Sequence, residues 1–129
     1  MLKSTIIKIH ITPNYNFLNS IRNFISETGT SLNIDFNIIE DIKLAVNESI
    51  NLTMSDKIQP EYIELCLEFS EMIKAKITSG YSSDINKLKL NTPEQKIGIT
   101  LIKHTAEDFM IKHHNKELII TFSKKNKID

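Results

Sequence analysis

The alternation of apolar and polar residues at the start of the chain predicts a strand. In residues 4–12, Ile7, Ile9 and Ile11 fall on one side and polar residues on the other. A period of two is typical of a half-buried strand with one face on the core. Pro13 follows directly, and we expect the strand to end there.

The next stretch changes to the spacing of amphipathic helices. Apolar residues recur every three to four positions from about residue 14 to residue 28. Gly29 follows, where a left-handed C-cap would end this helix. Asp35 is the expected N-cap of a second helix that runs to about Ser55. The apolar face of the second helix consists of Ile38, Ile42, Ala45, Val46 and Ser49.

The pattern returns to a period of two after Pro60. Two runs, 63–69 and 73–77, alternate between apolar and polar residues and predict neighbouring antiparallel strands. Opposite charges facing each other would stabilise the solvent side of such a pair. We therefore expect Glu64 and Glu68 to face Lys74 and Lys76 on a solvated surface.

A long polar segment, residues 79–91, shows no period and predicts a loop. Loops of this length in a compact domain are often lids or binding segments. The alternative is a disordered segment, which its lysine and asparagine content favours slightly.

Thr92, Pro93 and Gln95 form the pattern of a capping box and predict a helix that ends near Thr105. Gly98 lies inside this helix, where glycine costs about 1 kcal/mol relative to alanine, and so indicates a close backbone approach. Two final strands follow. Their apolar positions are Phe109, Ile111, Leu118, Ile120 and Phe122.

Strands and helices are grouped along the chain rather than strictly alternating. This order predicts an α+β fold with helices on one face of a mixed, mostly antiparallel sheet. The length of 129 residues is that of one domain. We expect a single domain over residues 1–129, with residues 124–129 as a frayed tail.

Composition excludes several classes of function. The 16 basic and 16 acidic residues cancel, so no general field attracts nucleic acid or anionic lipid. The single cysteine, Cys66, permits no intramolecular disulfide, and no leader or long apolar run is present. These features predict a cytoplasmic protein without direct nucleic-acid or membrane binding. His113 and His114 would point to opposite faces of a strand, and we find no metal-ligand spacing.

Glu48 is the main candidate for chemistry. It follows the apolar face of the second helix and lies on its flank, where a carboxylate can face a pocket. The helix pattern leaves two interpretations open, a functional acid and a solvated edge residue.

The order of elements resembles the GHKL ATPase superfamily (the Bergerat fold), and most closely its small bacterial serine-kinase anti-sigma factors. The run Ile39–Glu48 resembles the approach to the family's asparagine box, where a Glu is the general base and an Asn four residues later binds magnesium. Residues 97–109 resemble the last glycine box, its helix and the next strand. The resemblance implies a two-layer α/β sandwich that binds ATP with magnesium, with Glu48 as the base.

The magnesium position departs from the family pattern. Leu52 stands four residues after Glu48, and its apolar side chain cannot coordinate a hard cation. Asn51 comes one residue early, and a shift of one residue turns a helical side chain by about 100°. Asn51 would replace the ligand only in a distorted helix; otherwise it is an exposed helix residue.

The glycine boxes depart as well. Ser79 stands where the family has an adenine-binding Asp and is followed by Gly80, and Tyr81 and Ser83 stand where glycines are expected. Asp84 lies too far along the chain to be a simple substitute. Gly98 alone remains of the second box, either as a remnant of nucleotide contact or as a packing glycine.

These departures favour a regulatory, anti-sigma-factor-like protein that works by protein–protein binding, with ATP binding weak or lost. The resemblance implies a sigma factor or an anti-anti-sigma (STAS) protein as partner, and a homodimer. The alternative is an active serine/threonine kinase that uses ATP and magnesium to phosphorylate an anti-anti-sigma protein, with Asn51 and Asp84 as substitute ligands. A third hypothesis is a domain detached from a two-component sensor. The candidate site residues are Glu48 as vestigial or active base, and Asn51, Ser79, Gly80, Asp84 and Gly98 for nucleotide binding.

Overall fold

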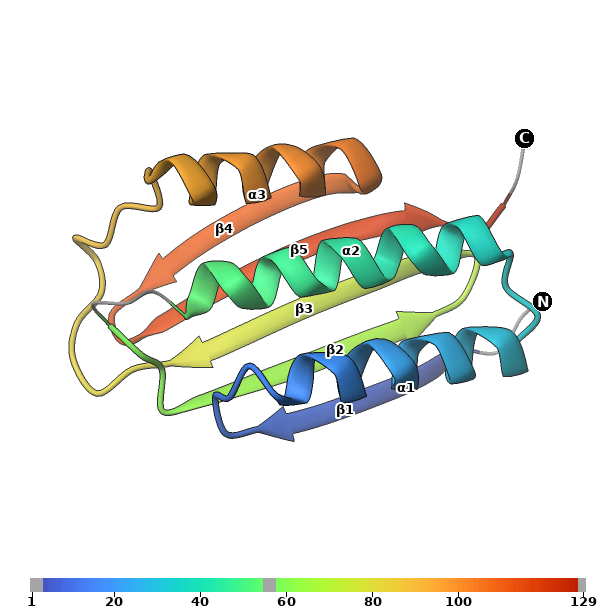
Figure 1. Cartoon of the computed structure of the whole chain (residues 1–129), viewed down its shortest axis with the longest axis horizontal. Coiled ribbons are helices and arrows are strands. Elements are labelled where there is room, and N and C mark those ends of the chain that lie inside the picture. Colours follow the sequence, from blue (N-terminus) through green and yellow to red (C-terminus); the bar gives the residue numbers. More distant parts are fainter. Residues whose placement is uncertain (1–3, 55–57, 128–129) are drawn as a thin grey trace.

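The computed structural model describes residues 4–54 and 58–127. Its elements, in chain order, are β1 (Thr5–Ile11), α1 (Phe17–Ser31), α2 (Phe36–Thr53), β2 (Tyr62–Phe69), β3 (Met72–Gly80), α3 (Pro93–Thr105), β4 (Glu107–His114) and β5 (Glu117–Lys125). The helices form one layer against one face of the sheet, as Figure 1 shows. The predicted α+β arrangement is confirmed.

The five strands form a single sheet in the order β1-β2-β3-β5-β4. Each pairing between these strands is antiparallel. The expectation of a mixed sheet is therefore wrong for the described residues. Antiparallel neighbours can be joined by tight turns, and both β2–β3 and β4–β5 use this connection. In the described chain, β1 and β4 are the two edge strands.

The central helix, α2, supplies the largest share of the helical side of the core. Its predicted apolar face is confirmed, because Ile42, Ala45 and Val46 are each at most 1% exposed. They pack with the inward residues of the central strands, such as Leu67 and Ile77. Burial of an isoleucine-sized side chain contributes about 1.5–3 kcal/mol, so this face fixes α2 on the sheet.

The pairing of β2 with β3 differs in part from the predicted charge pairs. Glu68 faces Lys74 as expected, but Glu64 faces Thr78 and Lys76 faces Cys66. The prediction of two Glu–Lys pairs is wrong for the second one. The reason is geometric. In an antiparallel pair the residue numbers of two facing residues add up to a constant, so a register that pairs 68 with 74 must pair 64 with 78.

Gly29 does not cap α1 in a left-handed conformation, and this prediction is wrong. The helix continues to Ser31, and the left-handed residue beyond it is Asn33 with φ 59°. A Cβ on Gly29 would lie 2.7 Å from Cγ1 of Ile39. The missing side chain therefore allows α1 and α2 to approach closely, and does not serve a turn.

The predicted helix starts are confirmed at α2 and α3. Asp35 caps α2 by accepting a hydrogen bond of 3.0 Å from the backbone N–H of Asn37. At α3, Thr92 accepts from the N–H of Gln95 at 3.2 Å, and the Gln95 side chain accepts from the N–H of Thr92 at 3.1 Å. Two otherwise unpaired donors are satisfied reciprocally.

The ends of three other segments shift relative to the predictions. Helix α2 ends at Thr53 with Met54 as its cap, and the predicted end near Ser55 lies outside the described residues. Strand β3 runs to Gly80, so the loop begins at Tyr81. Strand β5 runs to Lys125, so the prediction of a frayed tail from residue 124 is wrong there.

The end of β5 is held by specific contacts. The Lys124 ammonium lies 2.9 Å from a carboxylate oxygen of Asp41 on α2. The Asn126 backbone N–H donates to the carbonyl of Glu71 at 2.9 Å. Residues 128 and 129 of the predicted tail lie outside the described residues. Within the described part of the chain, no helix is both long and apolar enough to cross a bilayer.

Candidate functional site

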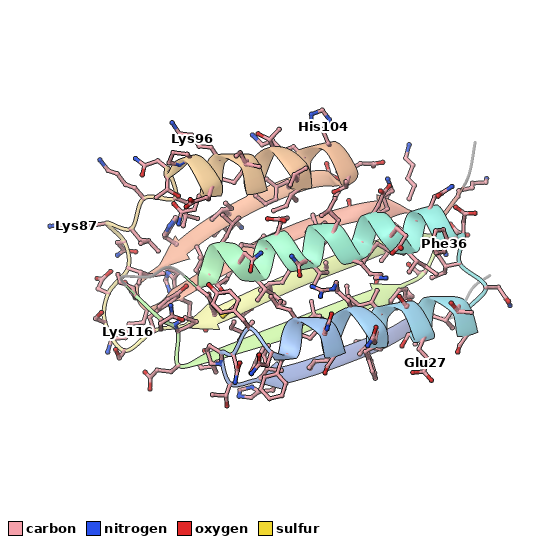
Figure 2. The ribbon with its side chains drawn as sticks, viewed as in Figure 1. Glu27, Phe36, Lys87, Lys96, His104 and Lys116 are labelled. Carbon is pink, nitrogen blue, oxygen red and sulfur yellow. The ribbon has the colours of Figure 1, made fainter. Side chains whose placement is uncertain are left out.

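A cavity of about 770 Å³ lies at one end of the helical layer. It is bounded by the C-terminal end of α2, the N-terminal half of α3 and the loop between β3 and α3. Figure 2 shows Lys87 on that loop and Lys96 on α3 at this end of the molecule. Its lining residues are Tyr15, Glu48, Asn51, Leu52, Met54, Ile58, Asp84, Ile85, Lys87, Leu88, Lys89, Asn91, Thr92, Glu94, Gln95 and Gly98.

Four of the six predicted site residues are brought together in this cavity. Glu48 and Asn51 come from α2, Asp84 from the loop and Gly98 from α3. Residues three apart on a helix lie on the same face, which explains why Glu48 and Asn51 both border the cavity. Within residues 4–54 and 58–127, neither of these two side chains has a hydrogen-bond or ion-pair partner.

The contact between Glu48 and Gly98 joins the two helices beside the cavity. A Cβ on Gly98 would lie 3.1 Å from a carboxylate oxygen of Glu48 and 4.0 Å from Leu52. This glycine therefore leaves room for the carboxylate next to the α3 backbone. The close approach predicted at Gly98 is confirmed, and the group it approaches is the carboxylate of Glu48.

Leu52 lies next to these polar groups and is part of the core. Its side chain is 2% exposed and lines the cavity four residues after Glu48. Asn51, one position earlier, also borders the cavity. α2 is a continuous helix from Phe36 to Thr53, so no helical distortion at 51 and 52 exchanges these two side chains.

Ser79 and Gly80 do not line the cavity. The Ser79 hydroxyl is buried, and its single proton is shared between the Tyr81 hydroxyl oxygen at 3.2 Å and the Leu118 carbonyl oxygen at 3.3 Å. Gly80 lies under the ring of Tyr62, and a Cβ there would be 2.1 Å from the ring carbon Cε1. The glycine is thus required by a neighbouring strand on the sheet.

The loop from Tyr81 to Asn91 is tied to the turn between β4 and β5. The backbone N–H of Tyr81 donates to Lys116 and that of Ile85 donates to Asn115, both at 2.8 Å. Ile85 is 1% exposed, and the Asp84 carboxylate accepts from the backbone of Asn86 at 2.8 Å. Of the two interpretations of this segment, these contacts favour an ordered wall of the cavity.

Two tyrosines to which the sequence analysis gives no such role hold the C-terminus of α2. The last carbonyls of a helix lack partners within it. The Tyr15 hydroxyl donates to the Met54 carbonyl at 3.0 Å, and the Tyr81 hydroxyl donates to the Thr53 carbonyl at 2.7 Å. Burial raises the pKa of Tyr81 above its usual value of 10.0, opposed by the Ser79 hydrogen bond. For Tyr81, the signal in the sequence was an aromatic residue at the start of an otherwise polar loop.

Comparison with known proteins identifies a shared fold. No family model and no curated protein matches this chain. Among solved structures, the chain is similar to the crystal structure of the RsbU and RsbW domains of Rv1364c from Mycobacterium tuberculosis. The TM-score is 0.65 at 16% sequence identity, over 92% of this chain and 32% of that one. This chain thus spans about a third of the length of that structure.

The comparison and the topology agree on the fold class. The chain is a two-layer α/β sandwich with the Bergerat fold, built on an antiparallel five-stranded sheet. At 16% identity the likeness concerns the fold alone.

Proposed function

We propose that this protein is an anti-sigma-factor-like regulator that acts by protein–protein binding, with ATP binding weak or lost. Its partner would be a sigma factor or an anti-anti-sigma (STAS) protein, in the cytoplasm. The fold shared with a structure containing an RsbW domain supports the class of protein. The composition of the cavity supports the loss of nucleotide binding.

The observation that carries the proposal is the burial of Leu52. A magnesium ion requires oxygen ligands in near-octahedral geometry. The position implied by the family pattern instead holds an apolar side chain that is 2% exposed and belongs to the core. Phosphoryl transfer depends on a positioned metal and on phosphate contacts, so this substitution removes a basic requirement of the reaction.

Two further features disfavour a bound Mg·ATP. The Ser79 hydroxyl, at the position implied for the adenine contact, is already bonded to Tyr81 and Leu118 inside the fold. The backbone at Gly98, the remaining glycine of the second box, already packs against the Glu48 carboxylate. The Ser79 hydroxyl is therefore committed to contacts within the chain, and the Glu48 side chain would have to move before a phosphate could reach the Gly98 backbone.

The outer flank of α1 supports a homodimer as part of the proposal. Phe17 and Phe24 are each 44% exposed, and helical rotation places both about 140–160° from Arg22. Arg22 donates to Asn47 of α2, so the two phenylalanines face away from α2. The edge strand β1 lies on the side of α1 opposite α2 (Figure 1). An unpaired edge beside exposed aromatic residues is a surface suited to pairing.

The test is direct binding to purified sigma factors and STAS proteins encoded by the same genome. We expect a stable complex with a member of one class in the absence of nucleotide, with ATP leaving its affinity unchanged. Binding to none of them, or binding that requires ATP and magnesium, would contradict the proposal.

An active serine/threonine kinase is the second candidate. The observation in its favour is the Glu48 carboxylate, which borders the cavity and has no partner among the described residues. Such a group is available as a general base. Transfer of the γ-phosphate of ATP to a STAS protein, lost in Glu48→Gln, would establish this alternative; no transfer would support the binding protein.

A further inference from the structure

Part of the cavity wall belongs to an apolar cluster that includes Tyr81. Tyr81, Ile85 and Leu118 are buried together, with Ile58 and Leu88 packed against them. Ile58, Ile85 and Leu88 also line the cavity, whereas Tyr81 does not. The Tyr81 ring therefore belongs to the cluster that forms the cavity wall, and it is 3% exposed.

The polar edge of this ring has a specific environment. Its hydroxyl donates to the Thr53 carbonyl at 2.7 Å and accepts from the Ser79 hydroxyl at 3.2 Å. Thr53 and Ser79 are at most 1% exposed. The space that the Tyr81 side chain fills thus has apolar walls and, at one end, the buried Thr53 carbonyl as an acceptor beside the Ser79 hydroxyl. These are the requirements of a planar aromatic ring that carries a hydrogen-bond donor on its edge.

The chain itself supplies that ring. Ligand sites of this kind are apolar, with a few fixed polar groups that orient the ligand. Removal of a buried side chain leaves a cavity when the surroundings relax only partly. The loop that carries Tyr81 is tied to the β4–β5 turn through Lys116 and Asn115, which limits its collapse. Shortening Tyr81 should therefore extend the cavity inward to Thr53 and Ser79.

We propose that Tyr81 is the residue that determines which ligands the cavity admits: its ring occupies an aromatic subsite and so keeps planar heteroaromatic bases out. The inference rests on the proposed function, in which nucleotide binding is weak. In this inference Tyr81 blocks the base of a nucleotide. Leu52 has a separate effect, because it replaces the ligand of the magnesium ion. A variant with a smaller residue at position 81 should bind a purine nucleoside without any phosphate or magnesium.

The experiment is calorimetric titration of the full chain with adenosine, with ribose as the probe that lacks the base. We expect Tyr81→Ala to bind adenosine at least about tenfold more tightly than the wild type, a difference of about 1.4 kcal/mol. Ribose should bind neither. Tyr81→Phe keeps the ring and should show no gain.

Tyr81→Leu serves as a second test, because it keeps apolar packing against Ile85 while vacating the polar end of the space. A gain in adenosine binding by either folded variant supports the inference. The inference is overturned if the folded variants bind adenosine no more tightly than the wild type. It is also overturned if Tyr81→Phe shows an equal gain, because that variant keeps the ring and its gain would come from a loosened structure and not from vacated space. Micromolar adenosine binding by the wild type would also overturn it. Wild-type binding of ATP contradicts the proposed function, whereas failure of the variants contradicts only the role of Tyr81.

Discussion

Buried hydroxyl groups decide how the cavity end of the molecule is held together. The Tyr81 hydroxyl joins Ser79 on β3 to the last turn of α2 through two hydrogen bonds. A buried polar group that loses its partner costs about 1–3 kcal/mol. The residues at positions 79 and 81, which differ from the family pattern, thus satisfy each other in a single structural network.

Tyr81→Phe should lower the free energy of unfolding by about 1–3 kcal/mol at pH 7, because the Thr53 carbonyl loses its donor. Burial raises the pKa of Tyr81, so above about pH 10 the unfolded state ionises first and the wild type loses stability as pH rises through the folded pKa. The difference in unfolding free energy between the wild type and Tyr81→Phe should therefore become smaller from pH 7 to pH 10.5. Urea denaturation at both pH values measures this, and a constant difference would contradict it.

The two helical glycines should respond oppositely to substitution by alanine. In Gly98→Ala the new Cβ meets the end of the flexible Glu48 side chain, which borders a cavity and can move. We expect the unfolding free energy to rise by up to about 1 kcal/mol, the gain in helix propensity. In Gly29→Ala the Cβ meets buried Ile39 at 2.7 Å, and overpacking should cost about 1–3 kcal/mol. Denaturant titration compares the two, and a loss above about 1 kcal/mol in Gly98→Ala would contradict a movable Glu48.

At the scale of elements, helix α3 depends on its capping box because its buried surface is small. Only Gly98 and Ile102 are buried in it, so the start of the helix contributes a large share of its stability. A helix with few buried residues depends on local interactions. The same N-terminal turn forms one side of the cavity.

Thr92→Ala should reduce the free energy of unfolding by about 1 kcal/mol, because the N–H of Gln95 loses its acceptor. Thr100→Ala is the matched control: its exposed hydroxyl bonds only the carbonyl of Lys96, and the change should stay within about 0.5 kcal/mol. Thermal denaturation of both variants gives the comparison. Equal effects would argue against a special role for the cap.

The helices and strands could largely be predicted from the sequence. Apolar residues recur every two residues in a strand and every 3.6 residues in a helix when one face of the element is buried. The face of α2 and the capping box of α3 are examples. Gly29 was misinterpreted because the same residue serves a left-handed turn or a close contact, and only the position of Ile39 distinguishes the two. The register of β2 with β3 depends on all the residue pairs of the two strands. The prediction that Glu64 faces a lysine considered charge alone and was therefore wrong.

The cavity could be predicted only in part for a similar reason. Glu48, Asn51, Asp84 and Gly98 come from three segments that the fold brings together. A resemblance to a fold places such segments, but not the side chains that fill the space between them. The roles of Tyr15 and Tyr81 depend on which carbonyls of α2 they reach, and that information lies in the tertiary structure.

For the whole molecule, the exposed edge at β1 predicts self-association. The double variant Phe17→Glu, Phe24→Glu should convert a dimer into a monomer, because four added charges would lie within one symmetric interface. Phe36→Glu is the control, since Phe36 is 69% exposed at the start of α2 (Figure 2) and lies outside that surface. Light scattering coupled to gel filtration measures the mass. A wild-type monomer, or equal effects of both changes, would refute this interface.

The central claim is that the chain keeps the Bergerat fold while its cavity no longer binds Mg·ATP effectively. Isothermal titration of the wild-type protein with ATP, with and without magnesium, tests it most directly. The account predicts no binding tighter than about 1 mM under either condition. Micromolar binding that requires magnesium and is lost in Glu48→Ala or Asn51→Ala would contradict it.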